Sequence, residues 1–64
     1  MCESNAYLEE AEGETMLMEN VGHLVLEGDA VVLEGILGDR VRVEKGSIKE
    51  INFLDHRIVL TKTG

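Results

Sequence analysis

The chain has 64 residues, of which 44% are hydrophobic, and a formal net charge of −7 at pH 7. This length predicts a single small domain over residues 1–64, which would bury only about 60% of the surface that its unfolded form exposes. No apolar run approaches the roughly 18 residues of a membrane span, and the N-terminus lacks the basic and apolar regions of a signal peptide. A lone cysteine without a secretion signal predicts a protein of the reducing cytoplasm, with no membrane association.

The charge is unevenly distributed along the chain. Residues 1–39 carry ten acidic side chains and no Lys or Arg, whereas residues 40–64 carry all six bases and three acids. An acidic half repels a phosphate backbone, which argues against nucleic acid as a partner. The same negative field attracts cations, although an acidic surface also simply keeps a small domain in solution.

Short segments of alternating apolar and polar residues follow one another from residue 15 to residue 62, which is the period of β-strands. They are TMLMEN (15–20), HLVLEG (23–28), the more continuously apolar AVVLEGIL (30–37), VRVEK (41–45), SIKEINFL (47–54) and RIVLTK (57–62). Turn signals separate them near residues 12–13, 20–22, 28–29, 38–39, 45–46 and 55–56. The pattern predicts an all-β fold, a meander of short antiparallel strands closed into a small barrel or sandwich.

The segment 47–54 is apolar on both sides. Strict alternation places Ile48 and Leu54 on one face and Ile51 and Phe53 on the other. A strand with two apolar faces either crosses a barrel or is covered by a partner. Small domains often add a disulfide, a metal or a second subunit, and one cysteine cannot form an internal disulfide. A metal or a second subunit therefore remains, and the two apolar faces of segment 47–54 favour a homodimer.

Catalysis has little support in this sequence. The chain offers no plausible set of nucleophile, base and orienting group, and a domain of this size has little room for a substrate pocket. Cys2 with His23 or His56 is too small a set to indicate a nucleophilic pair. Met16 and Met18 are expected to pack in the core. The chain is therefore predicted not to be an enzyme.

Cys2, the only cysteine, offers a compact metal site. If Met1 is retained, its α-amine, the Cys2 backbone nitrogen and the Cys2 thiolate can close two five-membered chelate rings, whereas without Met1 the Cys2 amine and thiolate close one. Planar nitrogen and sulfur sets of this kind suit Ni(II) or Cu(II). Binding would release protons, so the affinity is expected to rise with pH. The alternative is an incidental cysteine, and His23 and His56 are possible but less favoured imidazole ligands.

Several motifs together resemble the CooT family of small nickel-binding proteins. They are MCES with YL, then LMENV, EGD, LEGILGD and the closing IKEINFLDHRIVL. The family is named for an accessory protein in the maturation of nickel-containing carbon monoxide dehydrogenase. The resemblance implies a small SH3-like barrel, a homodimer and nickel bound through Cys2, which occupies the family's cysteine position directly after the initiator Met.

The expected function is therefore a nickel-binding accessory protein. It would carry or store Ni(II) for metalloenzyme maturation, with Met1 and Cys2 as metal ligands and a nickel enzyme or its maturation factors as partners. A thiol beside a free terminus suits a carrier, because such a ligand can release its ion as well as capture it. The alternative is a small SH3-like module that binds protein or RNA and has an incidental Cys2.

Overall fold

Six β-strands make up the fold in a computed structural model that describes residues 3–63. They are β1 (Ser4–Glu10), β2 (Gly13–Glu27), β3 (Ala30–Gly35), β4 (Arg40–Val43), β5 (Gly46–Asn52) and β6 (Arg57–Lys62). The predicted all-β class is confirmed. Over the described residues no helix has the length and apolar character needed to cross a membrane.

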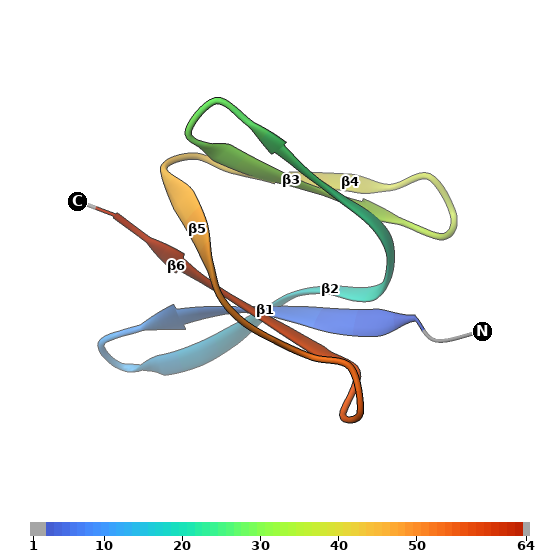
Figure 1. The fold of residues 1–64 in the computed structure, drawn as a ribbon, viewed down its shortest axis with the longest axis horizontal. Helices are drawn as coiled ribbons and strands as arrows, with labels where there is room; N and C mark the ends of the chain where they lie inside the picture. The colour runs from blue at the N-terminus through green and yellow to red at the C-terminus, as the bar shows by residue number, and fades with distance from the viewer. Residues whose placement is uncertain (1–2, 64) are drawn as a thin grey trace.

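The strands form one curled sheet in the order β4-β3-β2-β1-β6-β5. Figure 1 shows β3 and β4 lying across from β1 and β6, with β5 leaning back toward β3, so that the sheet makes the half-open barrel of an SH3-like fold. β1–β2, β2–β3, β3–β4 and β5–β6 pair antiparallel, as expected, but β4 and β5 lie at opposite edges of the sheet, so the strands do not form a simple meander. The β1–β6 pair is parallel, with Asn5 opposite Arg57, because it joins the two ends of the chain rather than a hairpin.

Strand β2 is longer than the alternation pattern indicates. Segments 15–20 and 23–28 belong to one strand, whose first half pairs with β1 and whose second half pairs with β3. Val21 stands at the junction, opposite both Ser4 and Gly35. The turn expected at 20–22 is instead a bend, in which Asn20 adopts a left-handed φ of 55°. Asparagine tolerates this conformation better than most residues, so the chain bends without ending the strand.

Four register shifts interrupt the strand pairing, and two of these bulges change which side chains face inward. One lies opposite Ala6 and Tyr7, where β2 has an additional residue, so Met18 is buried whereas Met16 is 45% exposed. The expectation that both methionines pack in the core is therefore wrong for Met16. The other bulge lies between Ile48 and Glu50. Since a one-residue shift reverses the facing of later side chains, Ile51 lies opposite Ile58 on the same face of the sheet as Ile48, although the Ile51 side chain is still 40% exposed.

The core lies inside the curl of the sheet. Leu33, Leu60 and Val31 are the largest fully buried side chains. Leu33 lies opposite Leu24 of β2 and Val41 of β4, in one half of the sheet. In the other half, Leu60 lies between Leu8 of β1 and Ile48 of β5. Aliphatic cross-strand rows of this kind hold a sheet together, so the small core depends on a few large side chains. The cluster comprises Ala6, Leu8, Met18, Val21, Val31, Leu33, Val43, Ile58 and Leu60.

Candidate functional site

The predicted metal ligands Met1 and Cys2 lie outside the described residues. The structure does describe the part of the chain that leads to them. Glu3 is half-buried, and β1 begins at Ser4, which pairs with Val21 at the bend of β2. The elements that surround the start of β1 are therefore the described part of the candidate site.

Three hydrogen bonds link the start of β1, the bend of β2 and two turns. The Asn5 backbone N–H donates to the His56 carbonyl oxygen over 2.9 Å. On the other side, the Asn20 N–H donates to Asn5 Oδ1 over 3.2 Å, and the Ile36 N–H donates to the Asn20 carbonyl oxygen over 3.1 Å. Turn 53–56, turn 36–39 and the start of β1 thus lie at one end of the molecule, which we call the N-terminal face (Figure 1).

The two histidines lie in separate elements. His56 belongs to turn 53–56, is exposed and has a φ of 55°, and its carbonyl oxygen holds Asn5. His23 lies on β2, where its Nδ1 is 3.4 Å from Glu34 Oε1 of β3. Across residues 3–63 no three His, Asp or Glu side chains come together as possible metal ligands. The described part of the chain therefore does not supply a complete metal site by itself.

Several basic side chains of the sheet form ion pairs with neighbouring carboxylates. Arg57 donates to Glu14 over 2.7 Å and its guanidinium lies 4.5 Å from the centre of the Tyr7 ring, and Lys49 pairs with Glu9. Donating hydrogen bonds to these carboxylates stabilises the charged forms of Arg57 and Lys49 and raises the pKa of both side chains.

Arg42 of β4 pairs with Glu44 and Glu27, and the hydrogen bond that Arg42 donates to Glu44, followed by the one it donates to Glu27, raises the pKa of Arg42. The ion pairs of residues 3–63 do not include Glu19 beside the bend or Asp55 of turn 53–56. The N-terminal face therefore retains negative charge that the neighbouring cations do not neutralise.

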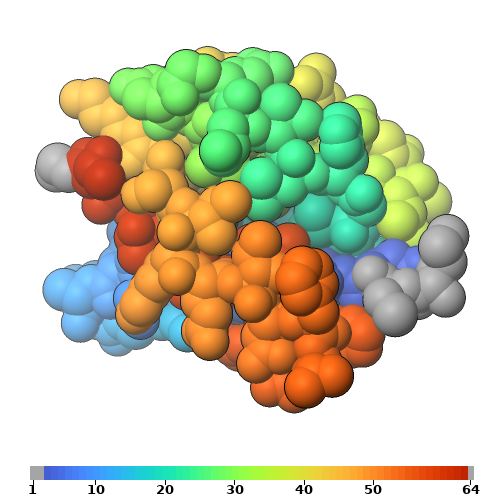
Figure 2. Space-filling view, in the orientation of Figure 1, coloured from blue at the N-terminus to red at the C-terminus, as the bar shows by residue number. Residues whose placement is uncertain are grey.

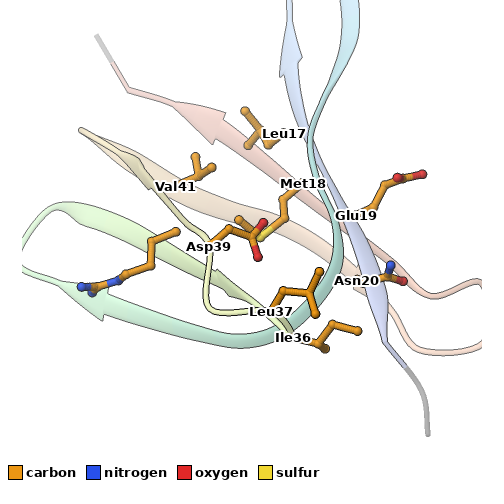
Figure 3. Close-up of a pocket in the computed structure, with 9 residues that line it drawn as sticks. Leu17, Met18, Glu19, Asn20, Ile36, Leu37, Asp39 and Val41 are labelled. Carbon is orange, nitrogen blue, oxygen red and sulfur yellow. The ribbon is translucent and has the colours of Figure 1, made fainter.

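A groove of about 340 Å³ opens beside the bend of β2. Figure 3 shows Met18 and Asp39 at its centre, with Leu17 and Val41 on one side and Leu37 on the other. Leu17 and Val41 also pack against the core, so the groove is the place where the half-open barrel leaves its interior accessible. A concave apolar surface of this size suits a bound side chain or a small ligand.

Large apolar side chains are concentrated on the two turns of the N-terminal face. Leu37 is 91% exposed on turn 36–39, and Phe53 and Leu54 are 79% and 92% exposed on turn 53–56. Figure 2 shows the orange turn 53–56 projecting at the lower edge and the yellow-green turn 36–39 at the right. The alternation pattern assigns these residues to strands and so misses them. The signal that could have identified them is an apolar pair next to turn residues, as in ILGD and FLDH.

Comparison with protein families matches residues 1–61 to the family described as CO dehydrogenase accessory protein CooT. Among solved structures, the chain is similar to the crystal structure of a protein described as CooT from Carboxydothermus hydrogenoformans. The TM-score is 0.87 at 33% sequence identity, over 98% of this chain and 100% of that chain. Comparison with curated protein sequences found no match. With nearly its whole length matched in sequence and in fold, the chain belongs to the CooT family.

Proposed function

We propose that this protein is a non-catalytic accessory factor that binds Ni(II) and carries or stores it in the cytoplasm for the maturation of a nickel enzyme. Cys2 supplies the thiolate, and Met1 supplies the α-amine if it is retained. The ion is cargo in this proposal, and it is captured and released rather than held as a structural element. The enzyme or its maturation factors are the partners that receive it.

The position of Cys2 is the observation that carries this proposal. The match to the CO dehydrogenase accessory family begins at residue 1, so it includes the cysteine directly after the initiator methionine. An amine, a backbone nitrogen and a thiolate from two consecutive residues can chelate a metal without help from the rest of the fold. Such a donor set favours Ni(II) or Cu(II) over the tetrahedral sites that suit zinc.

The described structure supports this proposal in two ways. Hydrogen bonds of Asn5 fix the start of β1 between turn 53–56 and the bend of β2. Glu19 and Asp55 lie next to residues that make these bonds, and their negative charge attracts cations. Both features suit capture of a metal ion at the N-terminal face.

Replacing Cys2 with alanine is expected to abolish nickel binding and to leave the metal-free fold intact. Titration of the native protein with Ni(II) should produce thiolate-to-nickel charge-transfer absorption, which should be absent in Cys2→Ala. The free energy of unfolding without metal should change by no more than about 0.5 kcal/mol, as for substitutions away from cores. Cys2→Ser is a matched control, because it keeps the side-chain size but lacks the soft thiolate.

Equal nickel absorption in the native protein and in Cys2→Ala would refute the proposal and favour an SH3-like binding module with an incidental cysteine. Unfolding of Cys2→Ala would also count against it, because the thiol would then be a core element. If Cys2→Ala keeps its fold and loses nickel binding, the thiol acts as a terminal ligand. A structural metal site would instead stabilise the fold itself.

The second element of the proposal is a homodimer that forms without metal. A chain of this size has a small core, and Ile51, Phe53 and Leu54 remain 40%, 79% and 92% exposed in a single copy. Light scattering on the metal-free protein should therefore give about twice the mass of one chain. A monomer at micromolar concentration would contradict this expectation and would leave these apolar side chains in water.

A further inference from the structure

Strand β4 forms one edge of the sheet and pairs with β3 alone. Its register from Arg40 to Val43 contains no bulge, whereas β5, the other edge, is interrupted by the bulge between Ile48 and Glu50. A regular edge strand presents backbone N–H and C=O groups with which an extended segment can pair, and a bulge disrupts such pairing. Of the two edges, β4 is therefore the one that can accept another strand.

The groove beside the bend of β2 follows the inner side of this edge. Its walls are apolar at Leu17 of β2 and Val41 of β4, but Asp39 lies at its centre and Glu19 also lines it (Figure 3). Neither carboxylate belongs to the ion pairs found among residues 3–63. A long basic side chain matches this lining, because its methylene groups can cover the apolar walls while its charged end reaches a carboxylate.

A second hollow, of about 250 Å³, lies on the outer side of the same edge. The residues that line it are Val32, Arg40, Val41 and Arg42. Arg42 already pairs with two carboxylates, whereas Arg40 belongs to none of the ion pairs found in the described part of the chain. Glu34, opposite Arg40 on β3, has its Oε1 atom 3.4 Å from Nδ1 of His23 instead. An acidic side chain therefore suits this hollow, because a carboxylate can accept hydrogen bonds from the Arg40 guanidinium.

We propose that β4 accepts an extended segment of a partner protein as an additional strand, and that this segment carries an acidic, a basic and an acidic residue in succession. Successive residues of a strand face opposite sides of the sheet, and residues opposite each other share a side. The basic residue lies opposite Val41 and enters the groove toward Asp39. Its two acidic neighbours lie opposite Arg40 and Arg42, on the outer side. Main-chain hydrogen bonds supply the affinity of such a contact, and the alternate side chains supply its specificity.

The charges of β4 exclude a second copy of this chain as the added strand. Two β4 strands paired with each other would place Arg40 and Arg42 of both copies on one side of the sheet, and like charges opposite each other destabilise strand pairing. The bulge of β5 prevents that strand of another copy from matching the regular edge. Strand β4 also lies away from turn 53–56 (Figure 1). The inference therefore depends neither on the homodimer nor on nickel binding.

A capped peptide of sequence Thr-Val-Glu-Lys-Glu-Val-Thr is the probe, because it presents the three charged residues between strand-forming ones. Added to the metal-free, isotope-labelled full chain, it should shift the amide resonances of residues 17–20 and 39–43 and leave those of residues 48–52 unchanged. The edge has only four residues, so the contact is small and we expect a Kd on the order of 0.1–1 mM. Absence of these shifts at about 5 mM peptide, several times that Kd, would overturn the proposal.

A second peptide with the same composition tests the alternation. In Thr-Glu-Val-Lys-Val-Glu-Thr the acidic residues face the same side as the lysine, so they cannot reach the arginines while the lysine occupies the groove. This peptide should bind at least about tenfold more weakly than the first. Equal binding of the two peptides would refute the proposed division of the charges between the two sides of β4.

Variants of the full chain test the two hollows separately. Arg40→Glu should weaken binding of the first peptide at least about tenfold. Lys62→Glu makes the same change of charge on β6, at a residue that also belongs to none of the ion pairs among residues 3–63, and should bind as native protein does. Asp39→Asn should weaken binding of this peptide but not of one with norleucine in place of lysine.

Three results would overturn the proposal. They are unchanged binding by Arg40→Glu, equal weakening by Lys62→Glu, and the same loss for Asp39→Asn with either peptide. Sedimentation velocity without peptide should give native protein and Arg40→Glu the same mass. A lower mass for Arg40→Glu would show that β4 contacts a second copy, and would equally overturn the assignment of this edge to a partner protein.

Discussion

Replacing Leu60 with alanine is expected to lower the free energy of unfolding by about 2–5 kcal/mol. Leu60 is fully buried and lies between Leu8 and Ile48, so its removal leaves a cavity that two strands must close together. A 64-residue chain has a total stability on the order of 3–10 kcal/mol. The substitution therefore removes a large part of what holds the fold, and urea denaturation at a fixed protein concentration measures the loss.

Leu26→Ala is the matched control for this experiment. Leu26 is also a strand leucine, but it is 62% exposed, so its truncation should change the free energy of unfolding by no more than about 0.5 kcal/mol. Protein concentration must be equal in all samples, because the proposed dimerisation would add to the apparent stability. If both variants lost the same stability, the assignment of the core to the inside of the curled sheet would be wrong.

Adding residues before Met1 is expected to weaken nickel binding as strongly as Cys2→Ala does, provided that the α-amine is a ligand. The extension converts the amine to an amide, which removes a basic donor and opens one chelate ring. The loss of affinity should exceed the roughly 10- to 100-fold that follows removal of a group that only orients a metal ligand. Competition with a chromophoric nickel chelator measures the affinity of both proteins.

The same residues added after Gly64 provide the control, because they leave the amine free. This variant should bind nickel as tightly as native protein. Tight binding by the N-terminally extended protein would show that the amine is not a ligand. The other donors would then have to be sought at a second copy's Cys2, at His23 or at His56, and of these two histidines His56 is the one that directly borders the start of β1.

Much of the fold could be predicted because β-strands alternate with a period of two. RIVLTK predicts β6 directly, since Ile58 and Leu60 both point into the core. The alternation pattern does not identify SNAYLEE as a strand. Ala6 and Leu8 are the only apolar residues on its inward side, which is too few for a clear pattern. Bulges could not be predicted either. They depend on how two strands fit each other, as Met16 and Met18 show, and not on the order of residues in one strand.

The candidate site also has one part that the sequence predicts and another part that depends on the fold. Cys2 and Met1 follow from the sequence, because the chemistry of an amine, a backbone nitrogen and a thiolate in consecutive residues does not depend on the fold. The surroundings of the start of β1 do depend on it. Turns 36–39 and 53–56 are distant in sequence, and only the pairing of β1 with both β2 and β6 brings them to one face.

The sequence by itself thus determined the all-β class, the family and the candidate metal ligands, because composition, local periodicity and adjacent donors are properties of short stretches of chain. Only the tertiary structure decided the facing of Ile51 and Met16, the parallel β1–β6 closure and the shared face of Leu37 and Phe53. These features arise from contacts between residues far apart in the chain. Their geometry is set by the curl and the bulges of the whole sheet, which no single strand specifies.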